Sequence, residues 1–550
     1  MARNTDSYGS ARWANAADLA SEGLFTFNGF EHDSNQFRNN SDRRRYIASS
    51  PQKRALLVGT LANPAEMMQG IREGYDSSMS SLMDGLVSLF KKNHHGEYLG
   101  WTGDGHVITV APTRSGKGVG LVVPNLLHYP GSVIVIDPKG ENYAITAEYR
   151  RNVLKQEIVC LDPFHVMTEH TDSINPLDGL VKNHTAPSTY LTQNPELADI
   201  AANIAEAIIM RDVGSKDSHW DDKARTFLKG IILAVICGKG PRKMRHLSEV
   251  RELIAQPFVK LEDFLYDVMR ADATSAGGAL QRAANEILSC GSNELKSIIS
   301  SALKHTEFLD SELMCAALGD KSDGGRGTYD LKNLKQYGGV SIYMIIPPHH
   351  LTRYVRAIRL WVTMAMAAMT RYPGKPADGC PVLFMLDEMA QLGTMEMMRQ
   401  AVSLLAGYGM SVWMVWQDLS QMKALYEHDW PTFLANAKIQ QFFGINDHET
   451  AKYISEMLGA ATIQTSSVSQ SKNYQQGALW ESRSGSSQSV SSQEMSRNLL
   501  NPDEVRRLNR LAVLTFVQGI PPIIAKRITY FQDDMFMRRA ANNPYYNFSK

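Results

Sequence analysis

The stretch HVITVAPTRSGKGVGLVVPNLL, residues 106–127, decides the fold. A β-branched run leads into a turn of small residues and then into a segment that can form a helix. A standard phosphate-binding loop reads GxxxxGK[ST] between a strand and a helix, and the matching window here begins at Ala111. Gly116 and Lys117 are in place, but Ala111 replaces the first glycine and Gly118 replaces the serine or threonine. The stretch predicts a strand–loop–helix unit that binds phosphate.

In such a loop, backbone N–H groups face the β-phosphate, helped by the positive end of the following helix. The residues expected to hold the nucleotide are Thr113, Arg114, Ser115, Gly116, Lys117 and Gly118. Lys117 would neutralise the β- and γ-phosphate oxygens. Because Gly118 has no hydroxyl group, one expected Mg²⁺ ligand is missing, and water, Ser115 or Thr113 could take its place. The alternative is a glycine-rich strand–helix turn with an accidental lysine.

Two carboxylates follow another apolar run, PVLFMLDEMAQLG (381–393). Asp387 would hold Mg²⁺, and Glu388 would orient and deprotonate an attacking water. The alternative is a helix N-terminus, where the helix dipole favours acidic residues. Gln417 ends the run SVWMVWQ on what would be the next strand, where its amide could sense the γ-phosphate or simply be solvated. The candidate catalytic residues are therefore Lys117, Glu388 and Gln417.

A further polar segment, IDPKGENY (136–143), follows the strand after the phosphate-binding loop. Asp137, Lys139 and Glu141 could lie at the rim of the nucleotide site. They could equally form a surface turn with local ion pairs. The sequence favours neither arrangement.

The rest of the chain predicts an α/β fold. Short apolar runs that end in turn signals occupy residues 106–112, 132–138, 157–163, 340–348, 381–388, 411–417, 439–446 and 511–519. Several are apolar throughout rather than alternating, so we expect strands buried on both faces of a central, mainly parallel sheet. Between about 187 and 310 the apolar residues recur at helical spacing without a convincing strand. This pattern predicts an all-α domain inserted into the α/β domain.

These patterns divide the chain into segments. We expect an N-terminal segment (1–95), a first part of the nucleotide-binding domain (96–186), the all-α domain (187–310), the second part of the nucleotide-binding domain (311–535) and a C-terminal tail (536–550). Residues 465–497 are rich in Ser and Gln, which predicts a mobile loop or a polar hairpin. The run SSLMDGLVSLF (80–90) has helical spacing and is expected to pack on the protein, with contact to a membrane or partner as the alternative.

Composition excludes several classes of protein. The chain has 550 residues, 21% charged residues and a formal net charge of zero, so no global basic surface points to nucleic acid. The five cysteines form no CxxC pair, which argues against a zinc site or a disulfide framework and fits a reducing cytoplasm. There is no signal peptide and no apolar run of about 18 residues, so we expect that the chain as written does not cross a membrane.

With these residues in hand, the chain resembles the coupling proteins of type IV secretion systems, of the TraG/TraD type. The stretches that carry the resemblance are APTRSGKGVG (111–120), VIDPKGENY (135–143), INPLDGL (174–180), SHWDDKAR (218–225), FMLDEMAQLG (384–393), VWQDLSQM (415–422), GINDHETAKYISEMLG (444–459) and LLNPDEVRRL (499–508). The resemblance implies a RecA-like P-loop ATPase domain with an inserted all-α domain, and ATP and Mg²⁺ as cofactors. It also implies the nucleotide grip by Lys117, the acidic pair Asp387 and Glu388, and the sensor Gln417.

The resemblance further implies partners and a location. The family works as a homo-hexamer at the cytoplasmic face of the bacterial inner membrane, although a chain without its membrane segment could be a monomer. It presents relaxase-bound single-stranded DNA, effector proteins or both to components of the type IV secretion channel. Family members usually carry two transmembrane helices before YGSARWA (8–14), and these are absent here. We expect either a trimmed chain or a natural member without them.

Some family members also carry an arginine that reaches the phosphate in the neighbouring subunit. Arg399 is a weak substitute for it in this chain, and Arg356 and Arg359 are others. We expect each of these to be a solvated helix arginine instead.

Three functions follow from these observations. The first is an ATP-hydrolysing coupling protein that recruits DNA–relaxase complexes or effector proteins and delivers them to the secretion channel. The second is a substrate receptor that binds ATP with little hydrolysis, which the missing hydroxyl at Gly118 would suit and Glu388 argues against. The third is a small-molecule kinase, which the absence of a lid segment with clustered arginines disfavours.

Overall fold

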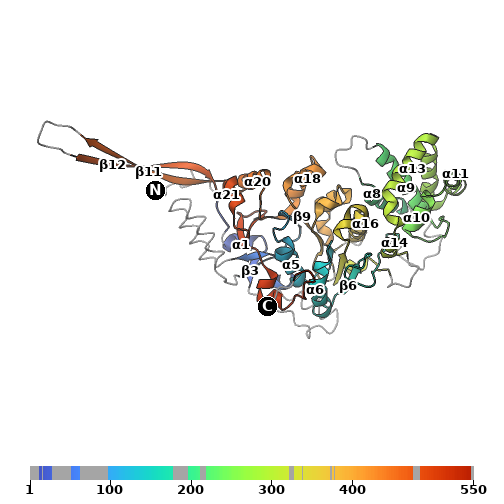
Figure 1. The fold of residues 1–550 in the computed structure, drawn as a ribbon, viewed down its shortest axis with the longest axis horizontal. Helices are drawn as coiled ribbons and strands as arrows, with labels where there is room; N and C mark the ends of the chain where they lie inside the picture. Colours follow the sequence, from blue (N-terminus) through green and yellow to red (C-terminus); the bar gives the residue numbers. More distant parts are fainter. Residues whose placement is uncertain are drawn as a thin grey trace.

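A computed structural model of the chain shows an α/β body with a group of helices at one end and a long hairpin at the other (Figure 1). The structure describes residues 11–14, 16–27, 51–61, 97–177, 196–210, 219–320, 328–336, 339–371, 374–376, 378–474 and 484–546. The expected helix over 80–90 lies outside these residues. A 12-stranded sheet runs through the body in the order β1-β3-β2-β14-β13-β10-β4-β9-β8-β5-β7-β6.

One half of the sheet is parallel. Its strands, in spatial order, are β10 (Ala437–Phe442), β4 (His106–Val110), β9 (Met410–Trp416), β8 (Val382–Leu386), β5 (Val133–Ile136), β7 (Val340–Met344) and β6 (Glu157–Leu161). Alternate residues pack on opposite faces. Val107 joins an apolar cluster with Leu121 and Leu126, whereas Ile108 joins the cluster that contains Trp361. Both faces are buried, as the continuous apolar runs predicted.

The other half of the sheet is antiparallel and joins the two ends of the chain. Its strands are β1 (Leu24–Phe27), β3 (Glu97–Trp101), β2 (Leu56–Leu61), β14 (Ile523–Lys526) and β13 (Ala512–Val517). Strand β13 pairs with β10, and this pair connects the two halves. Every strand expected from the sequence is present, whereas β1, β2, β3 and β14 were not expected.

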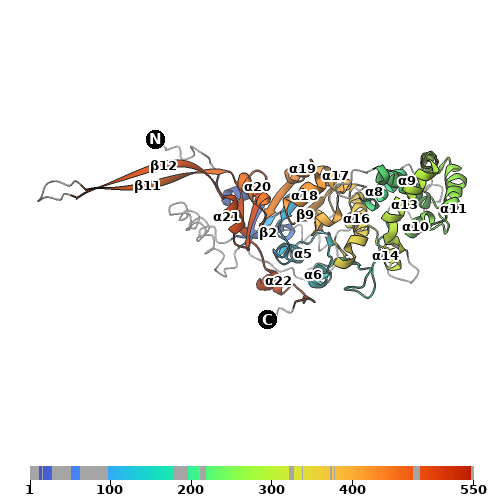
Figure 2. The same ribbon diagram turned by 45° about the horizontal axis from the view of Figure 1, so that its top comes forward.

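Helices fill the chain between β6 and β7. The α-helices described there are α8 (Leu197–Ile208), α9 (His219–Ile236), α10 (Leu247–Ile254), α11 (Phe258–Asp263), α12 (Ala279–Leu288), α13 (Ser292–Thr306), α14 (Glu312–Ala317) and, just before β7, α15 (Asn333–Gln336). The described residues between 196 and 320 contain no strand. Figures 1 and 2 show this helical segment at the end of the body away from the hairpin. Helix α16 (Pro348–Arg371), which follows β7, packs against α8 and joins the segment to the sheet.

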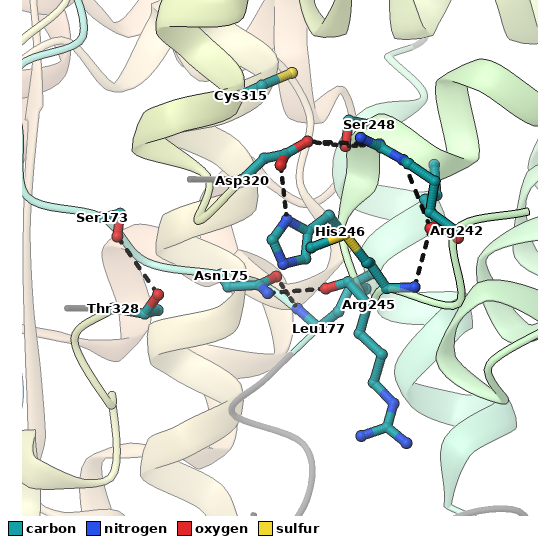
Figure 3. A network of polar contacts seen from close by, with 12 residues as sticks. Ser173, Asn175, Leu177, Arg242, Arg245, His246, Ser248, Cys315, Asp320 and Thr328 are labelled. Carbon is teal, nitrogen blue, oxygen red and sulfur yellow. Dashed lines mark hydrogen bonds and ion pairs between the residues drawn. The ribbon is translucent and has the colours of Figure 1, made fainter. Parts of the chain in front are cut away.

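A network of polar contacts, partly buried, connects the base of the helical segment to the chain that follows β6 (Figure 3). Asn175 Nδ2 donates to the carbonyl oxygen of Arg245 at 2.8 Å, and Asn175 Oδ1 accepts from the Leu177 N–H at 2.9 Å. Asp320 joins His246 and Ser248 in the same network. Because the Asp320 carboxylate lies between the serine and the histidine, this group stabilises the fold and does not form a nucleophile–base pair.

The Ser/Gln-rich segment forms a hairpin. Strands β11 (Ala460–Tyr474) and β12 (Ser484–Asn498) pair antiparallel in register from Ala460 opposite Asn498 to Tyr474 opposite Ser484. The hairpin extends far from the body in both views (Figures 1 and 2). Of the two structures expected for 465–497, the hairpin is therefore confirmed. Among the described residues, no helix has the length and apolar character that crossing a bilayer requires.

Candidate nucleotide site

The phosphate-binding loop begins where β4 ends, inside the sheet. Every residue of β4 is buried, and the Ala111 N–H donates to the carbonyl oxygen of Trp416 on β9 at 2.8 Å. Gly116 has a φ of +87°, which residues with a Cβ rarely adopt. After Lys117, a π-helical turn (Gly118–Val122) continues directly into α5 (Val123–His128). The loop thus lies at the start of a helix, an arrangement that binds phosphate.

The expected catalytic side chains meet at the ends of β4, β8 and β9. Lys117 Nζ lies 3.7 Å from Glu388 Oε1. Gln417 Nε2 donates a hydrogen bond to Glu388 Oε2 at 3.1 Å. Strand β9 lies between β4 and β8 in the sheet, so Gln417 follows the strand that separates the other two. The Glu388 carboxylate is therefore held from both sides.

Asp387 is the candidate Mg²⁺ ligand. Burial raises its pKa to about 7; the positive charge of Lys117 opposes this shift, and the negative charge of Glu388 adds to it. Asp387 Oδ1 is enclosed and has no hydrogen-bond partner among the described residues. A carboxylate oxygen in this position is a suitable ligand for a hard cation.

The unpartnered atoms at the loop fit a nucleotide with Mg²⁺. Within the described residues, Ser115 Oγ, Lys117 Nζ and Asp387 Oδ1 are buried without a hydrogen-bond partner. Such atoms are rare in folded proteins unless a ligand or water satisfies them. The described residues contain no group of three or more His, Cys, Asp or Glu side chains that could hold a metal. Proteins commonly hold Mg²⁺ with one or two carboxylates together with substrate phosphates and water, and Asp387 supplies one such carboxylate.

The remaining loop residues differ in their surroundings. Thr113 and Arg114 are exposed, and Arg114 has a φ of +62°. A Cβ added to Gly118 would meet no atom within 4 Å, so open space lies where the standard loop carries its hydroxyl group. The loop accommodates the glycine by leaving that space unfilled.

Asp137, at the end of β5, is buried at 2% exposure beside this site. Its carboxylate accepts a hydrogen bond from the Tyr143 N–H at 2.8 Å, and burial raises its pKa to about 7. The charges of Asp137 and Glu141 both raise the pKa of Asp387. Asp137 therefore does not belong to a surface turn, whereas Lys139 is exposed.

No sequence motif indicated Arg527, which follows β14 and whose side chain contacts the phosphate-binding loop. Its Nη1 donates to the carbonyl oxygen of Ser115. A Cβ on Gly116 or Gly120 would overlap the Arg527 side chain, so both glycines leave room for it. The arginine comes from the antiparallel half of the sheet, on the other side of β4 from Glu388. Only the return of the C-terminal strands to this sheet brings it here.

The three arginines considered as reaching a neighbouring subunit have other partners. Arg359 is 1% exposed and donates only to backbone carbonyl groups among the described residues, so the expectation of a solvated arginine is wrong for it. Arg356 is half-buried and contacts His305 Nδ1 at 3.2 Å. Arg399 is 40% exposed and forms ion pairs with Glu396 and Asp429.

Comparison with known proteins identifies relatives along most of the chain. A family model described as "Type IV secretory system Conjugative DNA transfer" matches residues 76–548. The chain is 27% identical over 559 residues to the conjugal transfer protein TraG of Escherichia coli, covering 97% of this chain and 78% of TraG. It is 28% identical over 450 residues to protein VirD4 of Rhizobium rhizogenes, covering 80% of this chain and 61% of VirD4.

The fold is similar to solved structures of the bacterial conjugative coupling protein TrwB. An unbound form matches with a TM-score of 0.55 and 15% identity over 77% of this chain and 85% of that chain. Other TrwB structures hold the ATP analogue ADPNP, or ADP and Mg²⁺. This likeness confirms the expected fold, a RecA-like α/β domain with a mainly parallel sheet and inserted helices. The chain belongs to the conjugative DNA transfer family of type IV secretory systems, the coupling proteins that its sequence resembles.

Proposed function

We propose that this chain is an ATP-hydrolysing coupling protein. It would recruit relaxase-bound single-stranded DNA, effector proteins or both, and deliver them to a type IV secretion channel. The observation that supports hydrolysis most directly is the position of Glu388 between Lys117 Nζ and Gln417 Nε2. The TrwB complexes with ADPNP and with ADP and Mg²⁺ support ATP and Mg²⁺ as the ligands.

Lys117 and the loop from Thr113 to Gly118 would bind the phosphates. Lys117 Nζ is 3.7 Å from Glu388, its only ion-pair partner among the described residues. A triphosphate beside the ammonium group would compete with this single carboxylate and release Glu388 toward water. Mg²⁺ held by Asp387 would neutralise the charge that develops on the β- and γ-phosphates.

Glu388 would then act as the general base, and Gln417 as the sensor. Gln417 keeps the carboxylate oriented through its hydrogen bond to Oε2. Phosphoryl transfer depends mainly on such positioning and on electrostatics. Loss of the γ-phosphate would change the contacts of Glu388 and hence those of Gln417. Helix α18 (Leu419–Tyr426), with Asp418 as its N-cap, begins two residues after Gln417 and would move with it.

The site would operate between adjacent subunits of a six-membered ring at the cytoplasmic face of the bacterial inner membrane. Family membership supports this assembly. The receptor that binds ATP with little hydrolysis is the second candidate. The observation that favours it is Gly118, which supplies no hydroxyl group to Mg²⁺.

The experiment that separates these functions is ATP turnover by the purified chain, with and without single-stranded DNA, next to a Lys117→Ala variant. Turnover that DNA stimulates and the variant lacks would support the hydrolysing coupling protein. Nucleotide binding without turnover, at every protein concentration and with the membrane segment of a relative attached, would favour the receptor.

A further inference from the structure

A buried cation bridges the α/β body and the helical segment. Arg359 lies on α16, which packs against both α8 and α17 (Glu396–Leu404) and lies between them in Figure 2. The side chain is 1% exposed. Its hydrogen bonds within the described residues go to the carbonyl oxygens of Glu206, Ala207, Leu392 and Thr394. Two of these belong to the helical segment and two to the loop after the acidic pair.

On the helical side, Arg359 caps the C-terminus of α8. Its Nε donates to the Ala207 carbonyl oxygen at 2.8 Å, and its Nη2 donates to that of Glu206 at 3.3 Å. The last carbonyl groups of a helix have no partner within the helix and carry the negative end of its dipole. A guanidinium group donates hydrogen bonds to these carbonyl groups and places a positive charge at the negative end of the dipole. The end of α8 is therefore held by a residue of another element.

On the other side, Arg359 holds the loop that begins at Glu388. Its Nη1 donates to the carbonyl oxygens of Leu392 and of Thr394, the latter at 2.9 Å. Gly393 separates them, with φ of +64° and ψ of −164°, a conformation almost restricted to glycine. This turn lets both neighbouring carbonyl groups face the same guanidinium nitrogen. The loop is short and is tied back to Glu388, whose carbonyl oxygen accepts from the Gln391 N–H at 3.0 Å.

Gln417 also connects to this loop. Helix α18 begins after Gln417, and at its last turn the Leu425 carbonyl oxygen accepts a hydrogen bond from Thr394 Oγ1 at 2.9 Å. Glu388 and Gln417, the proposed base and sensor, are therefore both connected to Thr394. Glu388 is connected through the loop that it begins, and Gln417 through helix α18. Thr394 in turn accepts a hydrogen bond from Arg359.

The bridge resists separation because the hydrogen bonds of Arg359 among the described residues all go to backbone carbonyl groups of the two parts that it joins. If the loop moved away from α8, charged donors would remain buried without acceptors, which is costly. Beside the guanidinium, a cavity of about 380 Å³ lies between α8 and α17. Space is therefore available for α8 to shift with the loop while the hydrogen bonds are kept.

We propose that Arg359 couples the loop after Glu388 to α8, so that the nucleotide state of the site reaches the helical segment. This inference rests on the proposed nucleotide site. Arg359 would be a positioning residue and would touch neither the nucleotide nor water. It would act by keeping four carbonyl groups from two parts of the chain on one rigid, planar cation.

The test is hydrogen–deuterium exchange of the whole chain, followed in peptides covering α8, with and without ADPNP and Mg²⁺. Arg359→Lys keeps the charge but replaces three guanidinium nitrogens with a single ammonium nitrogen, so it cannot make all four carbonyl contacts at once. Arg399→Lys is the matched control, because Arg399 lines the same cavity from α17 but pairs with surface carboxylates. Nucleotide binding and thermal unfolding are measured for every variant.

We expect ADPNP to change exchange at the end of α8 in the parent chain and in Arg399→Lys, and this change to be lost in Arg359→Lys while nucleotide still binds. The same change in Arg359→Lys, or no change in a parent chain that binds ADPNP, would overturn the coupling. A parent chain that binds no nucleotide would instead overturn the proposed site. If Arg359→Lys does not fold, Gly393→Ala serves, because it redirects the two loop carbonyl groups and leaves Arg359 in place.

Discussion

Gln417 Nε2 and Glu388 Oε2 lie 3.1 Å apart in a hydrogen bond that joins the ends of two neighbouring strands. The other oxygen of Glu388 faces Lys117 Nζ at 3.7 Å. A carboxylate with a lysine on one side and an amide on the other is restrained in position. Substitutions at this contact and at the residues around it test each part of the proposed mechanism.

The first prediction concerns the amide of Gln417. Gln417→Ala removes the hydrogen bond that orients Glu388, and such a bond is worth about 1 kcal/mol, so kcat should fall about fivefold with little change in nucleotide affinity. Steady-state turnover together with a titration of ADPNP measures both quantities. Gln440→Ala is the control, because Gln440 lies on β10 and donates to the Leu434 carbonyl oxygen instead. An unchanged kcat in Gln417→Ala would remove the sensor role.

The second prediction concerns pH. Burial raises the pKa of Asp387 to about 7, so protonation of this group contributes stability to the ligand-free protein that is fully present below the pKa of an exposed aspartate and is lost as pH rises through about 7. Mg²⁺ needs the ionised form. The affinity for Mg²⁺ with ADPNP should therefore fall as pH drops below about 7, approaching tenfold per pH unit.

Asp137 offers a way to test the cause of this pH dependence. Its negative charge raises the pKa of Asp387. Asp137→Asn keeps an oxygen for the Tyr143 N–H and removes the charge, so the midpoint of Mg²⁺ binding should move to lower pH. Titrations of Mg²⁺ between pH 5 and pH 8 would show it. A midpoint that stays in place would mean that the two carboxyl groups do not interact.

The third prediction compares two glycines of the loop. A Cβ on Gly116 would overlap Arg527, and the φ of +87° adds backbone strain of about 1–3 kcal/mol, so Gly116→Ala should abolish nucleotide binding. Gly118→Ala should be tolerated, because nothing lies within 4 Å of its Cβ. Isothermal titration with ADPNP and Mg²⁺ distinguishes them. Equal binding by both variants would contradict the loop geometry.

Much of the fold could be predicted because parallel strands are apolar throughout and stand out in the sequence. The strand of Val133 and the strand of Val382 were found in this way, and so was the helical segment, from its spacing. The short strand of Leu24 pairs only at the edge of the sheet, with a mixed burial pattern. It depends on partners far along the chain, and no local pattern indicates it.

The residues of the candidate site likewise include some that the sequence indicates and some that it does not. Lys117, Asp387 and Gln417 follow strands and carry side chains whose chemistry suggests a role, so their positions could be predicted. Arg527 and Arg359 could not, because an arginine after a strand or within a helix has no local signature. Their positions depend on which distant carbonyl groups the tertiary fold brings to them, as for Arg527 and Ser115.

The most direct test of a hydrolytic site is a comparison of the parent chain with Glu388→Gln. The substitution keeps an oxygen and the size of the side chain but removes the base, which contributes about 10²–10⁴-fold in such reactions. The measurement is phosphate release in a single turnover, with ADPNP binding determined in parallel. We expect Glu388→Gln to bind the nucleotide at least as well and to lose turnover by that factor. Phosphate release at the parental rate would contradict the assignment of Glu388 and the mechanism built on it.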